Sequence, residues 1–275
     1  MTVRSTLARL LPSPLTRSSA LLHLGAAASL IARPRAWPWA VGAVVADHLL
    51  LAGSGLLPRS ALLGPNLTRL PEPARARRAV ALTIDDGPDP EVTPQVLAIL
   101  DRSGARATFF CIGRQVASHP ELAREIVARG HALENHSYSH RHDFSLLGPR
   151  RIAQEIGEAQ STIRAISGSA PSFFRAPAGL RSPLLEPALA RAGLALVSWT
   201  RRGFDTVSGD PRRVLERLTR DLAAGDILLL HDGHAARTRS GAPVILEVLP
   251  RLLDTLAAAG LATVTLRSAT AGRAQ

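Results

Sequence analysis

The chain has 275 residues, 46% of them apolar, so it can bury the core of one large domain or of two small ones. Its net charge is +11 and all its basic residues are arginine, which favours an anionic surface or polymer as a neighbour. We expect no nucleic-acid partner, because the arginines are dispersed and aromatic residues for base stacking are few. Cys111 is the only cysteine, so no internal disulfide can form, and its apolar neighbours predict a buried thiol.

Residues 1–57 predict a membrane-associated helical segment. Residues 19–32 are apolar but short for a span, whereas residues 37–57 are long enough and carry two tryptophans at one end, where aromatic rings favour the membrane interface. Asp47 lies near the middle of the second stretch, where a carboxylate costs about 3 kcal/mol, so it needs a partner, for which the first segment is a candidate. The alternative is a buried hydrophobic hairpin in a soluble protein.

The membrane topology depends on the number of spans. A single transmembrane helix over residues 37–57 is preceded by five arginines, which favours the body of the chain on the outer face, although further arginines follow it. With two spans, both arginine-rich flanks would prefer the cytoplasm. We expect a membrane-anchored protein with its main domain on the periplasmic or extracellular face. Residues 58–78, rich in proline and arginine, predict a linker.

The body of the chain, residues 79–267, alternates short apolar runs with helical patterns. The apolar runs lie at 80–84, 107–112, 172–176, 195–200, 226–230 and 262–266. Between them, segments such as RRIAQEIGEAQSTIRAI carry apolar residues at helical spacing. This alternation predicts an α/β protein with a parallel sheet, open or closed into a barrel. Residues 268–275 are small and polar and predict a flexible tail.

Polar residues follow the ends of the predicted strands, where parallel α/β folds place their sites. These residues are Asp85 and Asp86, His136 and His140, Arg175, Asp205, and His231. Taken alone, the Asp pair also fits a solvated turn, and a histidine after four apolar residues also fits a core position with one hydrogen bond. Their arrival at successive strand ends instead indicates hydrolysis assisted by a metal ion.

The spacing of His136 and His140 suggests a metal site. On a helical turn, residues four apart present both imidazole rings to one side. Two imidazoles and one carboxylate leave an open position for water, as a catalytic zinc or a similar ion requires. One member of the Asp pair would bind the metal while the other takes a proton from the water. The histidine that ends the run DILLLH would act as general acid, held protonated by Asp205. Arg175 would orient Asp85 or form a plain ion pair. His142, Asp232 and His234 are weaker candidates for a further ligand.

These segments resemble the NodB-homology polysaccharide deacetylases, carbohydrate esterase family 4. TIDDGP, HSYSH, RAPAG, the Asp of GFDT and LLLH look like the five motifs of that family, in the family order, across about residues 79–267. The resemblance implies a deformed (β/α) barrel, a divalent metal that is usually zinc, and hydrolysis of N-acetyl, sometimes O-acetyl, groups on glycans. The implied partners are an acetylated glycan and, through the N-terminal segment, membrane lipid.

The resemblance also implies a role for each matching residue. These are Asp85 as general base, Asp86, His136 and His140 as metal ligands, His231 as general acid, Asp205 as the residue that tunes His231, Arg175 as the residue that orients Asp85, the backbone amide of Ala178 at the oxyanion, and Leu229 in the acetyl pocket. The sequence departs from the family at Ala178, where an aromatic residue is frequent, and at Thr206, where tryptophan is frequent. These departures keep open a related hydrolase of another amide or ester, or a decayed carbohydrate-binding protein.

Overall fold

A parallel sheet of eight strands forms the centre of the main domain in the computed structural model, which describes residues 12–271. Its strands are β1 (Ala79–Asp85), β2 (Thr108–Cys111), β3 (Ala132–Asn135), β4 (Phe173–Phe174), β5 (Ala195–Leu196), β6 (Arg201–Arg202), β7 (Ile227–His231) and β8 (Ala262–Val264). The order is β5-β4-β3-β2-β1-β7-β6, and β8 also pairs with β1. The predicted α/β fold with a parallel sheet is confirmed.

The sheet curls into a deformed, incompletely closed barrel. Its two edge strands, β5 and β6, are separated by only four residues, 197–200, although they lie at opposite ends of the strand order. Because four residues span at most about 15 Å, both edges must come close together. The apolar run predicted at 195–200 therefore forms β5 and the short connection that leads to β6. Strand β1 is buried along its whole length, because both of its faces are covered.

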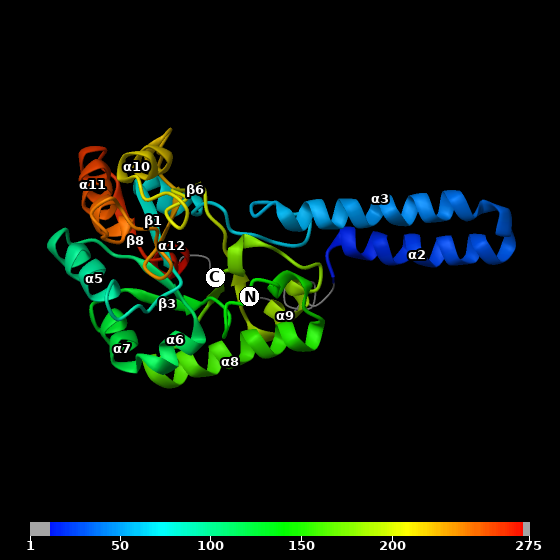
Figure 1. Cartoon of the computed structure of the whole chain (residues 1–275), viewed down its shortest axis with the longest axis horizontal. Coiled ribbons are helices and arrows are strands. Elements are labelled where there is room, and N and C mark those ends of the chain that lie inside the picture. The colour runs from blue at the N-terminus through cyan, green and yellow to red at the C-terminus, as the bar shows by residue number, and fades with distance from the viewer. Residues whose placement is uncertain (1–11, 272–275) are drawn as a thin grey trace.

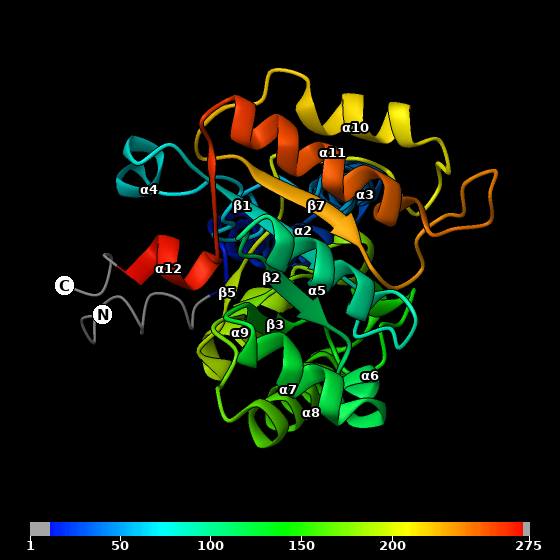
Figure 2. The same cartoon turned by 90° about the vertical axis from the view of Figure 1, so that its left-hand side faces the viewer.

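Helices cover the outside of the curled sheet (Figure 2). They are α5 (Thr93–Arg102), α6 (Gly113–Ser118), α7 (Pro120–Ala128), α8 (Pro149–Ser167), α9 (Leu185–Ala192), α10 (Pro211–Thr219) and α11 (Val244–Ala258), with the short helices α4 (Glu72–Ala76) and α12 (Leu266–Thr270). Of the 3-10 turns, η2 (Phe144–Leu146) and η3 (Pro177–Gly179) lie in loops of the domain, and η1 (Pro34–Ala36) lies in the N-terminal segment. Helix α8 shows why they pack this way: its buried residues Ile152, Ile156, Ala159 and Ile163 form one stripe at helical spacing.

Residues 58–78 pack against the domain. Leu63 and Leu70 are buried, and Leu67 forms a parallel bridge with Val197 beside the edge strand β5. The Leu70 amide donates to the Gly225 carbonyl at 2.8 Å, next to strand β7. The segment predicted as a linker therefore lies along the gap between the two edges of the sheet.

The C-terminal end is ordered further than the sequence suggested. Residues 266–270 form α12, in which Leu266 and Ala269 are buried. The Leu266 amide donates to Thr108 Oγ1 at 2.9 Å, and Arg267 pairs with buried Glu134. The flexible tail expected at 268–275 is therefore wrong for residues 268–270, which belong to α12 and include the buried Ala269. Residues 272–275 lie outside the described part of the chain.

A hairpin of two long helices projects from the domain (Figure 1). Helix α3 (Trp37–Leu56) matches the predicted span, while α2 (Pro14–Ala32) begins earlier than expected, with the Ser13 side chain accepting from the Thr16 amide. Within the described residues, Pro34–Leu56 is the one helix long and apolar enough to cross a membrane, by length and composition. The partner expected for Asp47 is present: Ser19 Oγ of α2 donates to Asp47 Oδ2 at 2.6 Å.

The outer surface of the hairpin is apolar. Its exposed large side chains are Leu21, Leu24, Leu30, Ile31, Trp37, Trp39, Val41, Val45, Leu49, Leu50 and Leu56. The hydrogen-bonded Ser19 and Asp47, in contrast, are buried between the two helices. The hairpin thus hides polar groups and presents apolar ones.

The base of the hairpin is hydrogen-bonded to loops of the domain. The Gly55 carbonyl, near the end of α3, accepts from the Arg181 amide at 3.0 Å. The Pro58 carbonyl accepts from Ser198 Oγ at 2.6 Å. Both partners in the domain lie close in sequence to pocket-lining residues described below.

Candidate active site

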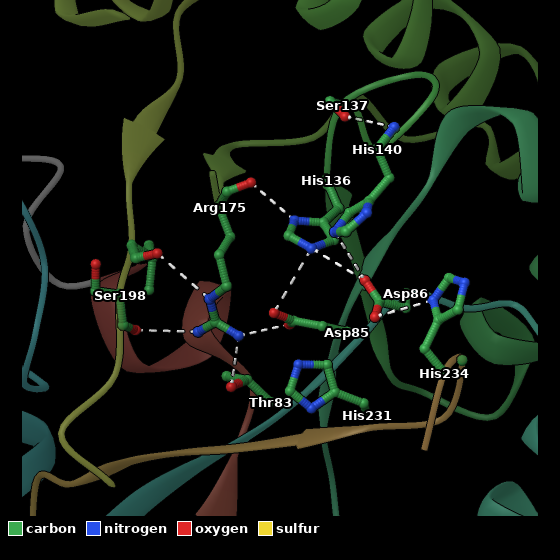
Figure 3. A network of polar contacts seen from close by, with 12 residues as sticks. Thr83, Asp85, Asp86, His136, Ser137, His140, Arg175, Ser198, His231 and His234 are labelled. Atoms are coloured by element: carbon green, nitrogen blue, oxygen red, sulfur yellow. Dashed lines mark hydrogen bonds and ion pairs between the residues drawn. The ribbon is translucent and has the colours of Figure 1, made fainter. Parts of the chain in front are cut away.

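The C-terminal ends of β1 and β7 bring the first two candidate residues together. Asp85 ends β1 and is in register with His231, which ends β7. Asp86 follows in the left-handed region with φ 78°, a conformation that aspartate tolerates better than most residues. The turn after β1 therefore presents two successive carboxylates at the same edge of the sheet (Figure 3).

Arg175, which follows β4, is completely buried beneath this edge and neutralises Asp85 (Figure 3). Its Nη1 donates to Asp85 Oδ1 at 2.6 Å and to Thr83 Oγ1 at 2.9 Å, and its Nη2 donates to the Ser198 carbonyl at 3.0 Å. Its guanidinium carbon also lies 4.1 Å from the centre of the Phe110 ring. A buried, fully hydrogen-bonded guanidinium holds the carboxylate in one orientation.

Asp86 faces His136 and His140 across a gap that fits a cation. Asp86 Oδ1 lies 3.3 Å from His136 Nε2 and 3.2 Å from His140 Nε2, yet it is buried without a hydrogen bond. The Nδ1 of His136 donates to the Arg175 carbonyl at 2.8 Å, which fixes the ring with Nε2 directed toward Asp86. Burial, followed by the nearby His136, lowers the pKa of His140 to about 4, so the His140 ring is neutral at pH 7.

The charge state of Asp86 agrees with this arrangement. Burial alone would raise its pKa, but the contacts with His136 and His234 outweigh burial and hold the pKa of Asp86 well below its usual value. An ionised carboxylate oxygen that faces two imidazole nitrogens provides three candidate ligand atoms for one metal ion. These three residues therefore fit a divalent cation.

The route by which the two histidines converge differs from the expected helical turn. Residues 136–140 form a loop in which Ser137 and His140 have φ of 62° and 50°. Ser137 Oγ accepts from the His140 amide at 3.0 Å and closes the loop. The helical geometry was wrong, but the ring centres still lie 4.8 Å apart.

His231 and Asp205 form a buried pair. His231 Nδ1 lies 2.9 Å from Asp205 Oδ1, and the His231 amide donates to Asp205 Oδ2 at 2.7 Å. Burial opposes the charged ring, but the hydrogen bond that the ring donates to Asp205 and the carboxylates nearby outweigh burial and raise the pKa of His231 to about 9. The imidazole is therefore protonated at neutral pH and can donate a proton from Nε2.

These groups surround one cavity of about 570 Å³. Of the nine residues singled out in the sequence, seven line it: Asp85, Asp86, His136, His140, Ala178, Leu229 and His231. The other two, Arg175 and Asp205, lie behind the wall as partners of Asp85 and His231. Thr206 also lines the cavity, and Ala178 adopts φ 54° within η3.

The weaker candidates separate into two groups. His142 and His234 line the cavity, and His234 Nδ1 lies 3.3 Å from Asp86 Oδ2. Asp232 is wrong as a candidate ligand, because its carboxylate accepts from Thr93 Oγ1 at 2.5 Å and from the Gly233 amide at 3.0 Å, away from the three-residue cluster. Cys111 is buried as predicted, and burial raises the pKa of its thiol well above the usual value.

Two features of the cavity were not found from the sequence. Trp199 and Arg202 line it, although they lie in a run that was read only as a strand and its exit. Arg202 did not stand out in a sequence that contains so many arginines. The break between β5 and β6, which turns Trp199 toward the pocket, has no glycine or proline to mark it.

Known proteins are similar to this chain in sequence and in fold. Residues 73–197 match the family model described as polysaccharide deacetylase. A chitooligosaccharide deacetylase of Bradyrhizobium sp. (strain ANU 289) is 39% identical over 57% of this chain and 72% of that protein. A peptidoglycan-N-acetylglucosamine deacetylase of Bacillus cereus is 31% identical over 64% of this chain and 82% of that protein. A solved family 4 carbohydrate esterase from Streptomyces lividans, in complex with acetate, is 34% identical, with a TM-score of 0.61, over 67% of this chain and 91% of that one.

A curled parallel sheet with a carboxylate and histidine cluster at its C-terminal edge defines a hydrolase of the NodB-homology type. The chain belongs to the polysaccharide deacetylase family, carbohydrate esterase family 4, as the resemblance implied. The enzyme class expected from the motifs, a hydrolase that deacetylates polysaccharides, is confirmed with it.

Proposed function

We propose that the protein is a metal-dependent deacetylase that removes N-acetyl groups from an amino-sugar glycan. The observation that carries the proposal is the buried Asp86 Oδ1, which faces two histidine nitrogens and has no hydrogen bond. Asp86, His136 and His140 would hold the divalent ion, with zinc as the first candidate. When bound, the ion supplies Lewis-acid activation of a water and of the acetyl carbonyl.

The residues of the chain divide the proton transfers between them. Asp85, held by Arg175, takes a proton from the attacking water. His231, protonated because of Asp205, gives a proton to the departing amine nitrogen, which is a poor leaving group without it. Leu229 would contact the acetyl methyl group, and the backbone amide of Ala178 would stabilise the oxyanion.

The glycan itself is proposed from the named relatives, which act on chitooligosaccharide and on peptidoglycan. The alternative, another amide or an ester, rests on the absence of an aromatic ring at Ala178 and Thr206, both of which line the cavity. A decayed binding protein is disfavoured, because the base, the acid and the three candidate ligands are all present with their partners.

The chemistry can be tested by release of acetate from chitooligosaccharides, peptidoglycan fragments and O-acetylated polymers, with and without a chelator. The proposal expects release from an N-acetylated amino sugar, loss of activity with the chelator, and recovery with a divalent metal. Release only from the O-acetylated polymers would favour the esterase alternative. Activity that survives complete removal of metal would overturn the metal assignment.

For the location, we propose an anchor in residues 1–57, a connecting segment 58–78 and a deacetylase domain 79–267, with the domain on the periplasmic or extracellular face. Support comes from the apolar surface of the hairpin and from its two tryptophans near the tip. The outer face is proposed for α3 as a single span. Because α2 packs along α3, insertion of both helices would instead return the chain to the side from which it entered, and the arginine-rich flanks would then favour the cytoplasm.

The anchor can be tested with a chain that begins at Leu57, which keeps the packed residues Leu63, Leu67 and Leu70. The full chain should float with lipid vesicles, and the shortened chain should stay in the soluble fraction. Equal solubility of both without detergent would contradict the anchor.

A further inference from the structure

One guanidinium on the cavity wall has no counter-charge. Arg202 of β6 lines the cavity, and no ion pair or side-chain hydrogen bond engages it within residues 12–271. Its Nε is buried without a hydrogen-bond partner. The preceding residue, Arg201, is paired instead with buried Asp226 at 2.6 Å. Because successive side chains of a strand point to opposite faces, β6 carries one neutralised arginine and one unpaired arginine that faces the cavity.

Two aromatic rings hold Arg202 in place. Its guanidinium carbon lies 5.3 Å from the centre of the Trp199 ring and 4.9 Å from that of Phe204. Phe204 keeps φ at 59°, an unfavourable value for an aromatic residue, which the surrounding loop must impose. Stacking leaves the N–H groups in the plane of the guanidinium free, and it reduces the freedom that the side chain loses when a ligand binds. This is a preformed fork for a carboxylate or a phosphate.

The fork lies beside the proposed acetyl pocket. Arg202 is in register with Leu229, and His231 is two residues further along β7. Adjacent strands are about 4.8 Å apart, so a group bound to Arg202 belongs to the same sugar as the acetamido group or to its neighbour. Trp199 also lies 6.0 Å from the guanidinium carbon of Arg175, so one indole contacts both the neutralised arginine and the unpaired one.

The rest of the cavity adds positive charge and no free carboxylate. Asp85 and Asp86 are the acidic residues among those that line it; the first is paired with Arg175 and the second faces the two histidines. Arg114, at the start of α6, also lines the cavity and is exposed. A bound anion would therefore meet attraction rather than repulsion.

We infer that the substrate is an acidic glycan, in which a carboxylate or a phosphate next to the acetylated amino sugar binds the fork of Arg202. This inference rests on the proposed deacetylase function and specifies its substrate. A neutral chain of N-acetylglucosamine would leave the guanidinium buried against the rings without a partner, whereas an acidic neighbour would satisfy it with two charge-assisted hydrogen bonds.

The test compares three oligosaccharides of equal length: a neutral chitooligosaccharide, the same chain oxidised to carry one carboxylate at its end, and the same chain carrying one phosphate there. Binding to the full chain in detergent is measured by calorimetry, and acetate release is measured in parallel. Hydrogen bonds to charged groups predict about 10- to 100-fold tighter binding of at least one acidic chain. The two acidic chains separate carboxylate from phosphate as the bound group.

Three variants identify the residue responsible. Arg202→Gln should bring the ratio of acidic to neutral binding close to one, and Arg202→Lys should keep part of it, since a point charge replaces the fork. Arg141→Gln is the matched control: Arg141 lines the same cavity but already forms two hydrogen bonds of 2.8 Å with Asp143, so the ratio should persist.

Several results would overturn the inference. These are equal binding of neutral and acidic chains by the unmodified protein, an equal loss of both in Arg202→Gln, or a preference that disappears in Arg114→Gln but not in Arg202→Gln. Failure of the proposed function looks different: acidic chains bind better through Arg202, but no substrate releases acetate.

Discussion

Helix α3 of the hairpin and helix α8 of the domain have almost the same length and opposite surfaces. The 19-residue α8 buries Ile152, Ile156, Ala159 and Ile163, whereas the 20-residue α3 buries Ala40, Asp47, Ser54 and Gly55. In α3 the large apolar residues are outside, as Leu49 shows with 68% of its surface exposed. Large apolar side chains are therefore buried in α8 and exposed in α3, whereas α3 buries small and polar ones. The difference is what two solvents would produce, water around the domain and, as proposed, lipid around the hairpin.

The domain also buries several carboxylates, and the largest expected effect concerns the one that faces two histidines. Asp86 is a buried carboxylate proposed as a metal ligand, so Asp86→Asn should abolish metal binding and reduce acetate release to background. Metal content is measured by elemental analysis of the purified protein, and activity by acetate release. Flotation with vesicles should be unchanged, because the hairpin is untouched. Full metal content in this variant would refute the ligand role of Asp86.

The neighbouring carboxylate should respond differently. Asp85→Asn should lower the turnover number about 10²- to 10⁴-fold, the usual contribution of a positioned proton acceptor, while metal content stays unchanged. Steady-state kinetics and elemental analysis of the same preparation test both parts. If Asp85→Asn loses the metal and Asp86→Asn keeps it, the two roles are reversed. If both variants keep full activity, the pair is only a turn.

A matched pair of truncations, one buried and one exposed, tests the contrast between the two helices. Ile156→Ala in α8 should lower the free energy of unfolding by about 2–5 kcal/mol, because it leaves a cavity. Leu49→Ala in α3 should change it by less than about 0.5 kcal/mol, because the side chain is already exposed. Denaturant unfolding of the full chain in mild detergent measures both. A loss above 2 kcal/mol in Leu49→Ala would mean that the hairpin folds like a soluble core.

The smallest effect is a shift in pH dependence. The proposed acid, His231, has its pKa raised to about 9, so turnover should fall as the pH rises through that value and the imidazolium is lost. In Asp205→Asn the carboxylate is gone and burial then disfavours the charged ring, so this limb should move down by about 1–3 pH units. The pH profile of turnover on an N-acetylated oligosaccharide measures it. If the fall in turnover stays at the same pH in Asp205→Asn, Asp205 does not raise the pKa of the proposed acid.

The sequence predicted most of this site because strand ends converge in a parallel sheet. Asp85, Asp86, Arg175, Asp205 and His231 each follow an apolar run, and the topology alone brings such positions together. It also predicted that Asp47 needs a partner in α2, because a lone carboxylate in an apolar helix is costly.

Other features depend on long-range contacts that leave no periodic pattern. His136 and His140 converge through two left-handed residues of a loop, which spacing alone cannot distinguish from a helical turn. Residues 58–78 have the composition of a linker, yet Leu67 pairs with an edge strand more than a hundred residues away. Arg202 becomes conspicuous only once its neighbour Arg201 is seen to be paired and it is not.

The hydrogen bonds at the base of the hairpin have a consequence for where the enzyme could work. Pro58 accepts from Ser198, and Ser198 in turn accepts from the catalytic-site arginine, Arg175. Hydrogen bonds thus connect the base of the proposed anchor to the wall of the pocket, so the tilt of the hairpin in a bilayer would set the height and direction of the pocket mouth. Such an enzyme would deacetylate only the layer of glycan that lies at a fixed distance from the membrane surface. Polymer farther from the membrane would keep its acetyl groups.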